Sequence, residues 1–171
     1  YHQALEVDPL FTDAYYNLGL AQYAQGDVAQ GMTNFQRAIK SNPDDSDAYI
    51  WLGKGYYFHK QIDKAIQTWE KAIEIDAQAV YAYNSLADLY AEQGQYADAI
   101  AYYQQALAVP DQQGIPVSAH TLAHNGLGDA LQQQGNLKGA IEEYQESIRL
   151  DPSFIQAQKN LEEAQKNLVS Q

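Results

Sequence analysis

Asn17-Leu18-Gly19 decides the fold of this chain, because a triplet of the same kind occurs three more times. The later triplets read Trp51-Leu52-Gly53, Ser85-Leu86-Ala87 and Gly126-Leu127-Gly128. The small residue that ends a triplet returns after 34 residues in the second and third copies, and after 41 residues in the fourth. A nearly fixed period of this length indicates a protein built from stacked repeats.

Four further columns of residues line up when the chain is aligned on these triplets. A ring precedes each triplet, and a small residue, another ring and a second small residue follow it. Column by column, these residues are Tyr15, Tyr49, Tyr83 and His124; Gly31, Ala65, Ala99 and Ala140; Phe35, Trp69, Tyr103 and Tyr144; and Ala38, Ala72, Ala106 and Ser147. Apolar residues recur at helical spacing on both sides of a break such as Gln25-Gly26. Each copy therefore predicts two helices joined by a short turn.

This pattern resembles the tetratricopeptide repeat family, whose unit of about 34 residues carries a large residue, Leu-Gly, Tyr, Ala, Phe, Ala and Pro at set offsets. The resemblance covers nearly the whole chain. Two departures are Gln22 and Leu131, which replace the Tyr that the other two repeats keep as Tyr56 and Tyr90. A third is Ala87, which replaces a Gly. The resemblance implies an all-α fold, in which antiparallel helix hairpins form a right-handed superhelix (an α-solenoid).

The alignment on the triplets divides residues 1–171 as one repeat domain. Residues 1–11 fit the second half of a truncated repeat, which predicts a fragment of a longer protein. The complete repeats are 12–45, 46–79, 80–113 and 121–154, with an insertion loop at 109–120 and a capping helix at 155–171. The loop holds Pro110 and Pro116, and is expected either to be a plain connection or to contact a partner. The last helix has one apolar and one polar face, as an end cap requires.

Composition excludes several classes of function. The chain has 22 acidic and 10 basic residues, for a net charge of -12, so it repels phosphate backbones and no nucleic acid is expected as a partner. The charge instead suits a neutral, apolar or basic protein segment. No apolar run has the length of a membrane span, so no direct membrane insertion is expected. The absence of cysteine excludes disulfides and thiol chemistry, and leaves the redox compartment open.

No catalytic residue, metal site or cofactor is predicted. His120 and His124 have a spacing that can hold a metal, but His124 falls in a packing column and no Cys or third His lies near them. Carboxylate pairs such as Glu142-Glu143 are expected on the surface, without the enclosed pocket that acid–base chemistry needs. The chain has no Gly-rich phosphate loop and no recognisable nucleophile, so we predict that it is not an enzyme.

The resemblance places the first helix of each unit along a concave groove. On the inward positions, the first two repeats carry mostly rings, which anchor protein partners well. The third and fourth carry asparagines, which can hold an extended backbone. The residues predicted to bind a partner are Tyr16, Asn17, Leu20, Trp51, Lys54, Tyr57, Asn84, Asp88 and Asn125. The alternatives are that the rings pack between helices and that the asparagines form a solvated face.

The sequence thus predicts a protein–protein interaction scaffold that binds a peptide or protein segment in this groove, as part of a larger protein or assembly. The alternative is a structural module that forms a homo-oligomer through a convex face or a chain end, where Leu5 and Val7 of the truncated unit would be exposed. The carboxylate clamp of chaperone-binding relatives is excluded, because neither possible register supplies its cationic set. The asparagine ladder of some long arrays is matched only by Asn17.

Overall fold

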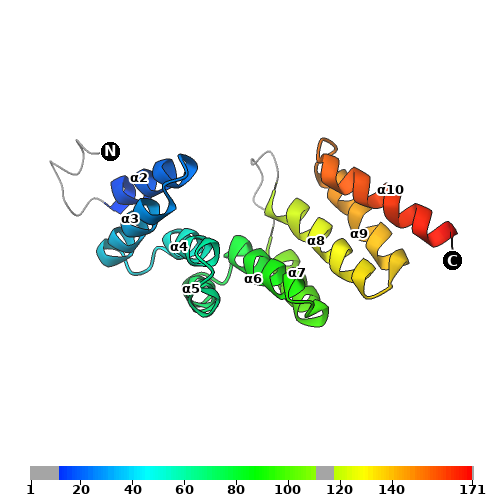
Figure 1. Cartoon of the computed structure of the whole chain (residues 1–171), viewed down its shortest axis with the longest axis horizontal. Coiled ribbons are helices and arrows are strands. Elements are labelled where there is room, and N and C mark those ends of the chain that lie inside the picture. Colours follow the sequence, from blue (N-terminus) through cyan, green and yellow to red (C-terminus); the bar gives the residue numbers. More distant parts are fainter. Residues whose placement is uncertain (1–11, 111–117, 171) are drawn as a thin grey trace. The chain divides into compact units, whose positions relative to one another are not determined.

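The structure, a computed structural model, describes residues 12–110 and 118–170. These residues form helices connected by short turns, with no strand among them (Figure 1). The helices are α2 (Thr12–Ala24), α3 (Val28–Ser41), α4 (Ser46–Phe58), α5 (Ile62–Ile75), α6 (Val80–Glu92), α7 (Tyr96–Ala108), α8 (Ala119–Gln133), α9 (Leu137–Leu150) and α10 (Ile155–Val169). The expected half-repeat at 1–11, with Leu5 and Val7, and most of the insertion, with Pro116, lie outside the described residues.

Internal contacts group the chain into two compact units, Tyr1–Ala82 and Tyr83–Gln171. The boundary falls inside α6. In the first unit, α2 packs against α3, α3 against α4 and α4 against α5. In the second unit, α8 packs against both α7 and α9, and α10 packs mainly against α9. Each unit is therefore a row of helices in which every helix mainly contacts its neighbours in sequence, as expected for a repeat protein.

The turn inside each hairpin requires a residue with positive φ. Gly26, Gly94 and Gly135 have φ of +86°, +74° and +83°, and Lys60 takes this place in the second copy with φ of +59°. A residue in the left-handed region ends the first helix of a pair and reverses the chain. This is the physical reason for the Gln-Gly breaks in the sequence.

A different device ends the second helix of a pair. The side chains of Asn42, Asp76 and Asp151 each accept a hydrogen bond from the backbone N–H two residues later, at 3.2, 2.9 and 2.9 Å. This Asx turn directs the chain into the next hairpin. The corresponding residue of the third copy is Pro110, and the insertion begins there.

The insertion ends earlier than predicted. Helix α8 begins at Ala119, inside the expected 109–120 loop, because the Ser118 hydroxyl accepts a hydrogen bond from the Thr121 N–H at 3.1 Å and caps the helix. The first helix of the fourth repeat therefore starts two residues before residue 121, where that repeat was predicted to begin.

Rings of the second helices form the centre of each core. In the first unit, Phe35 is fully buried among Val28, Met32 and Leu52. In the second unit, Tyr144 is fully buried beside Ala140 and Ala164, and Ala164 belongs to α10. The small residues of the triplets make room for these rings. A Cβ on Gly19 would lie 2.7 Å from Phe35 Cε1, and one on Gly128 would lie 2.5 Å from Tyr144 Cε1.

Candidate partner-binding faces

Three of the predicted residues of the first unit form a face over one core cluster. Tyr16 and Leu20 from α2 and Trp51 from α4 are half-buried and pack against the core cluster around Phe35. Tyr16 and Leu20 lie one turn apart on α2, and Trp51 lies on α4, the first helix of the next repeat. This regular spacing is why the sequence alone could group the three residues. The face is thus continuous with the core beneath it, and each ring keeps part of its surface exposed.

Trp51 has more partners than its sequence position indicates. Its ring centroid lies 6.2 Å from that of Phe35 at an interplanar angle of 21°, and 5.4 Å from that of Tyr23 at 70°. The Lys54 ammonium lies 4.6 Å from the Trp51 ring centroid and 5.7 Å from that of Tyr81, within the range of a cation–π interaction. Trp51 therefore contributes to the core as well as to the surface, and Lys54 is held over two rings.

Tyr16 also combines a ring packed on the core with a phenol hydroxyl. Its ring is tilted by 57° against Phe35 at 6.1 Å. Burial, followed by the nearby carboxylate of Asp47, raises the pKa of Tyr16 to about 12, while a hydrogen bond with Trp51 acts in the opposite direction. The phenol therefore stays neutral at ordinary pH and keeps a proton to donate.

Two predicted residues of the first unit are occupied within their own hairpin. The Asn17 amide donates to the Asp13 carbonyl one turn earlier in α2, at 2.7 Å. Tyr57 lies 6.2 Å from Trp69 of α5, and the Lys60 ammonium lies 5.5 Å from the Tyr57 ring. Tyr57 therefore contacts the second helix and the turn of its own hairpin.

Asn84, in the second unit, is buried rather than solvated. It is 5% exposed, and its Nδ2 donates to the Ala119 carbonyl at 2.8 Å. This bond ties α6 to the first residue of α8, directly after the insertion. Its Oδ1 is buried without a hydrogen-bond partner among the described residues. The structure therefore gives Asn84 a positioning role between helices.

Asp88 belongs to a tyrosine–aspartate pair that the third and fourth repeats share. The Tyr103 hydroxyl donates to Asp88 at 2.5 Å, and the Tyr144 hydroxyl donates to Asp129 at 2.7 Å. Burial, and then the neighbouring carboxylates, raise the pKa of both tyrosines. In the first two copies the ring column holds Phe35 and Trp69, which have no hydroxyl, and the aspartate position holds Leu20 and Lys54. This correlation was readable in the sequence and was missed.

Asn125 joins three helices through Asp129. Its Nδ2 donates to Asp129 Oδ2 at 3.3 Å, and its Oδ1 accepts from Asn160 Nδ2 of α10 at 3.0 Å. Asn160 also donates to Asp129 Oδ1 at 2.8 Å. Burial raises the pKa of Asp129, opposed by its bonds from Tyr144 and Asn125 and reinforced by Glu163. Asn160 was not predicted, because the sequence indicated for α10 only an end cap with one apolar and one polar face.

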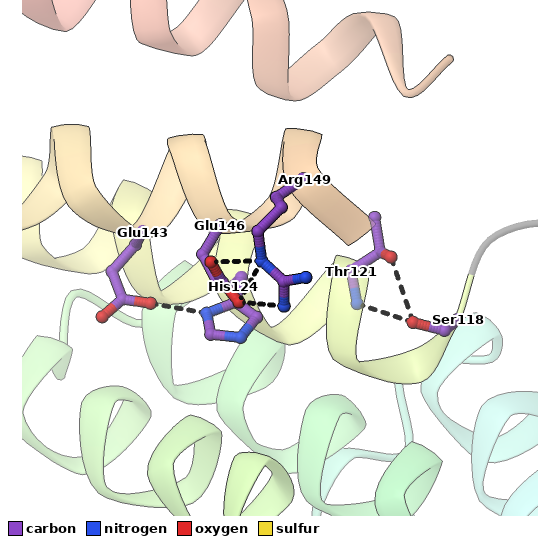
Figure 2. A network of polar contacts seen from close by, with 6 residues as sticks. All are labelled: Ser118, Thr121, His124, Glu143, Glu146 and Arg149. Carbon is purple, nitrogen blue, oxygen red and sulfur yellow. Dashed lines mark hydrogen bonds and ion pairs between the residues drawn. The ribbon is translucent and has the colours of Figure 1, made fainter. Parts of the chain in front are cut away.

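The two histidines with metal-like spacing are used in packing. Figure 2 shows Glu143 of α9 directed toward His124 of α8, and the Glu143 carboxylate lies 2.7 Å from His124 Nδ1. Arg149 Nε donates to both oxygens of Glu146 at 2.9 Å, which holds the pKa of Glu146 below its usual range. His120 is buried, with Nε2 3.0 Å from the Ala106 carbonyl.

The described residues contain no group of three or more His, Cys, Asp or Glu side chains placed to hold a metal ion. Among the helices of the described segments, none combines the length and apolar character needed to cross a membrane. The faces of α2 and α4 expose parts of rings, and those of α6 and α8 expose the carboxylates of Asp88 and Asp129.

Three family models match the chain, and each is described as a tetratricopeptide repeat. They cover residues 13–45, 44–112 and 84–153. No curated protein sequence matches the chain.

Several solved structures share the fold. One is from a functional characterization of Pseudomonas aeruginosa PilF, at 20% identity and a TM-score of 0.82 over 93% of this chain and 69% of that one. PilW, described as a type IV pilus biogenesis factor, has 22% identity and a TM-score of 0.77 over 91% and 69%. MamA has 24% identity and a TM-score of 0.69 over 91% and 81%. Similarity at these identities concerns the fold, which is an all-α solenoid of helix hairpins. The repeat models together span residues 13–153, and the chain belongs to the tetratricopeptide repeat family.

Proposed function

We propose that this chain is a protein–protein interaction scaffold, and that it holds a peptide or protein segment along the exposed faces of the first helices of its repeats. The observation that carries the proposal is the face of the first unit, where Tyr16, Leu20 and Trp51 are half-buried over one core cluster. Rings fixed from beneath lose little conformational entropy when a partner covers them. Such rings are typical anchors of protein interfaces.

The two units offer different chemistry to a partner. The first unit presents mainly rings, together with Lys54 held above Trp51. The second presents Asp88 and Asp129, each oriented by a tyrosine hydroxyl. A segment that is neutral or apolar suits the first set, and one with basic side chains suits the second. Self-association through another surface is the competing function, and the experiment below separates the two.

The test is an affinity capture from an extract of the source cells, with the double variant Tyr16→Ala/Trp51→Leu compared with the wild-type chain. Leucine retains apolar packing at position 51, where Ala would leave a cavity. We expect a captured protein to bind the variant at least about tenfold more weakly, as loss of interface anchors predicts. Tyr15→Ala is the matched control, because Tyr15 is a ring on the same helix that contacts Arg37 instead of the Trp51 cluster.

Equal capture by all three proteins contradicts the proposed binding face. Sedimentation velocity of the wild-type chain then tests the competing function, since a concentration-dependent dimer supports self-association and a monomer contradicts it.

A further inference from the structure

The turn between α4 and α5 (Figure 1) differs in sequence from the other three turns that join a first helix to its second. The other copies read Ala24-Gln25-Gly26, Glu92-Gln93-Gly94 and Gln133-Gln134-Gly135. The second copy reads Phe58-His59-Lys60. Three consecutive positions thus change from small or polar residues to apolar and basic ones.

Phe58 is exposed at a position where the fold requires no ring. Its side chain is 61% exposed, and its ring lies 5.6 Å from that of its neighbour His59 at 89°. The corresponding residues Ala24, Glu92 and Gln133 are also exposed, so the position faces solvent in every copy. A phenylalanine here adds nothing to the core, and leaves apolar surface available to a partner.

Lys60 occupies a conformation that a side chain resists. Its φ is +59°, where the other three turns have glycine, and the left-handed region brings Cβ close to the following carbonyl oxygen. The same backbone places the Lys60 ammonium 5.5 Å from the Tyr57 ring. Lys60 is therefore a strained residue at a position where the corresponding turns of the other three repeats have glycine. Backbone strain of this kind is typical of binding positions.

The surroundings of this turn are basic in an acidic chain. Residues 54–66 contain three lysines and one acid, Asp63, whereas the chain as a whole has a net charge of -12. Lys64, one helical turn after Lys60, has its ammonium 5.4 Å from the Tyr56 ring. The rings hold the two ammonium groups near the surface of the hairpin without neutralising their charge.

We propose that Phe58, His59, Lys60 and Lys64, here named the α4–α5 corner, form a second interaction surface for an acidic protein segment with an apolar or aromatic side chain beside its carboxylates. The lysines match the carboxylates, and Phe58 provides the apolar contact that fixes their register. This surface goes beyond the proposed function, because the faces described above suit neutral, apolar or basic segments. It depends on one hairpin, so the two interactions can be tested separately.

The experiment selects a phage-displayed library of random 12-residue peptides on the whole chain, and then measures fluorescein-labelled copies of the enriched peptides by anisotropy. We expect a group of enriched peptides in which Asp or Glu stands next to Phe, Trp or Leu. Phe58→Ser should weaken their binding about tenfold, as for an interface anchor. Lys60→Gly/Lys64→Gln should weaken it as well and reduce its dependence on salt, because fewer ion pairs form.

The controls separate loss of binding from loss of fold. Lys60→Gly gives this turn the residue of its sister turns, so helical circular dichroism should be retained. Tyr16→Ala, which alters the face of the proposed function, should leave binding of these peptides unchanged. The proposal is overturned if no acidic peptides are enriched, or if the corner variants bind them as tightly as the wild-type chain. It is equally overturned if phosphatidylserine vesicles compete for the corner more strongly than any peptide.

Discussion

At the scale of single residues, each glycine that ends a triplet is explained by the ring beside it. Tyr144 is fully buried, and its hydroxyl donates to Asp129, so the ring is held at both ends and cannot move away. A Cβ on Gly128 would lie 2.5 Å from Tyr144 Cε1, which is closer than carbon atoms approach without a shift.

We therefore expect Gly128→Ala to destabilise the chain. Alanine gains about 0.5–1 kcal/mol over glycine inside a helix, whereas overpacking a rigid core costs about 1–3 kcal/mol. Overpacking is the larger effect, and urea unfolding should show a net loss of about 1–2 kcal/mol. Gln133→Ala, on an exposed site of the same helix, is the control and should change stability little. A Gly128→Ala protein as stable as the wild type would mean that Tyr144 can move.

At the scale of elements, α10 is held by both apolar and polar contacts, and its half-buried Leu161 packs against the Tyr144 cluster. Its buried residues are Ala157 and Ala164, and these small side chains contribute little burial energy. The Asn160 amide supplies two hydrogen bonds to Asn125 and Asp129 of α8. The attachment of α10 therefore depends on this polar contact as well as on the apolar ones.

Asn160→Ala should loosen α10 selectively. The loss of two hydrogen bonds, one of them to a carboxylate, predicts about 1–3 kcal/mol less stability for this helix. Native-state hydrogen exchange should show faster exchange of the α10 amides, with a smaller change in α8 and α9. Lys159→Ala alters the neighbouring exposed residue and should leave the exchange pattern as it is. Unchanged α10 protection in Asn160→Ala would assign the attachment to the apolar contacts of α10 alone.

At the scale of the whole molecule, negative charge opposes the folded state. Burial raises the pKa of Asp47 and Asp129, and nearby acids add to the effect. A raised pKa means that the folded chain binds the proton more tightly than the unfolded chain does. The corresponding stability is complete below the ordinary aspartate pKa of 3.8, and is lost as pH rises through the raised values. The net charge of -12 acts in the same direction.

Thermal unfolding should therefore occur at a higher Tm at about pH 5 than at about pH 8. At the higher pH, raising the salt concentration from about 20 to about 200 mM should raise Tm, because salt screens the repulsion between carboxylates. Asp129→Asn keeps an acceptor for Tyr144, removes one raised pKa and should reduce the dependence on pH. A Tm that increases steadily toward alkaline pH would show that other groups dominate.

Much of the fold was predictable because it depends on local chemistry. The helix pairs follow from apolar spacing, and the turns follow from residues such as Gly26 and Gly135 that adopt positive φ. The start of α8 was misplaced by two residues, because a Ser118 cap inside an insertion has no periodic signal. The partner-binding role of the site residues stays a prediction, and their contacts within the chain were only partly foreseen. Trp51 was assigned to a binding face without its contacts to Phe35 and Tyr23, and Asn84 was not expected to be buried.

The sequence by itself determined the repeat, its helix hairpins, the rings at their centre and the acidic charge, since all of these depend on residue type and spacing along one chain. Only the tertiary structure decided the pairings between helices. It alone showed that Asn160 donates to Asn125 and Asp129 of α8, and that Phe58 is left outside the core. Asn160 and Asp129 are 31 residues apart in the sequence. Whether such residues meet depends on how the helices pack against one another, which no local sequence pattern determines.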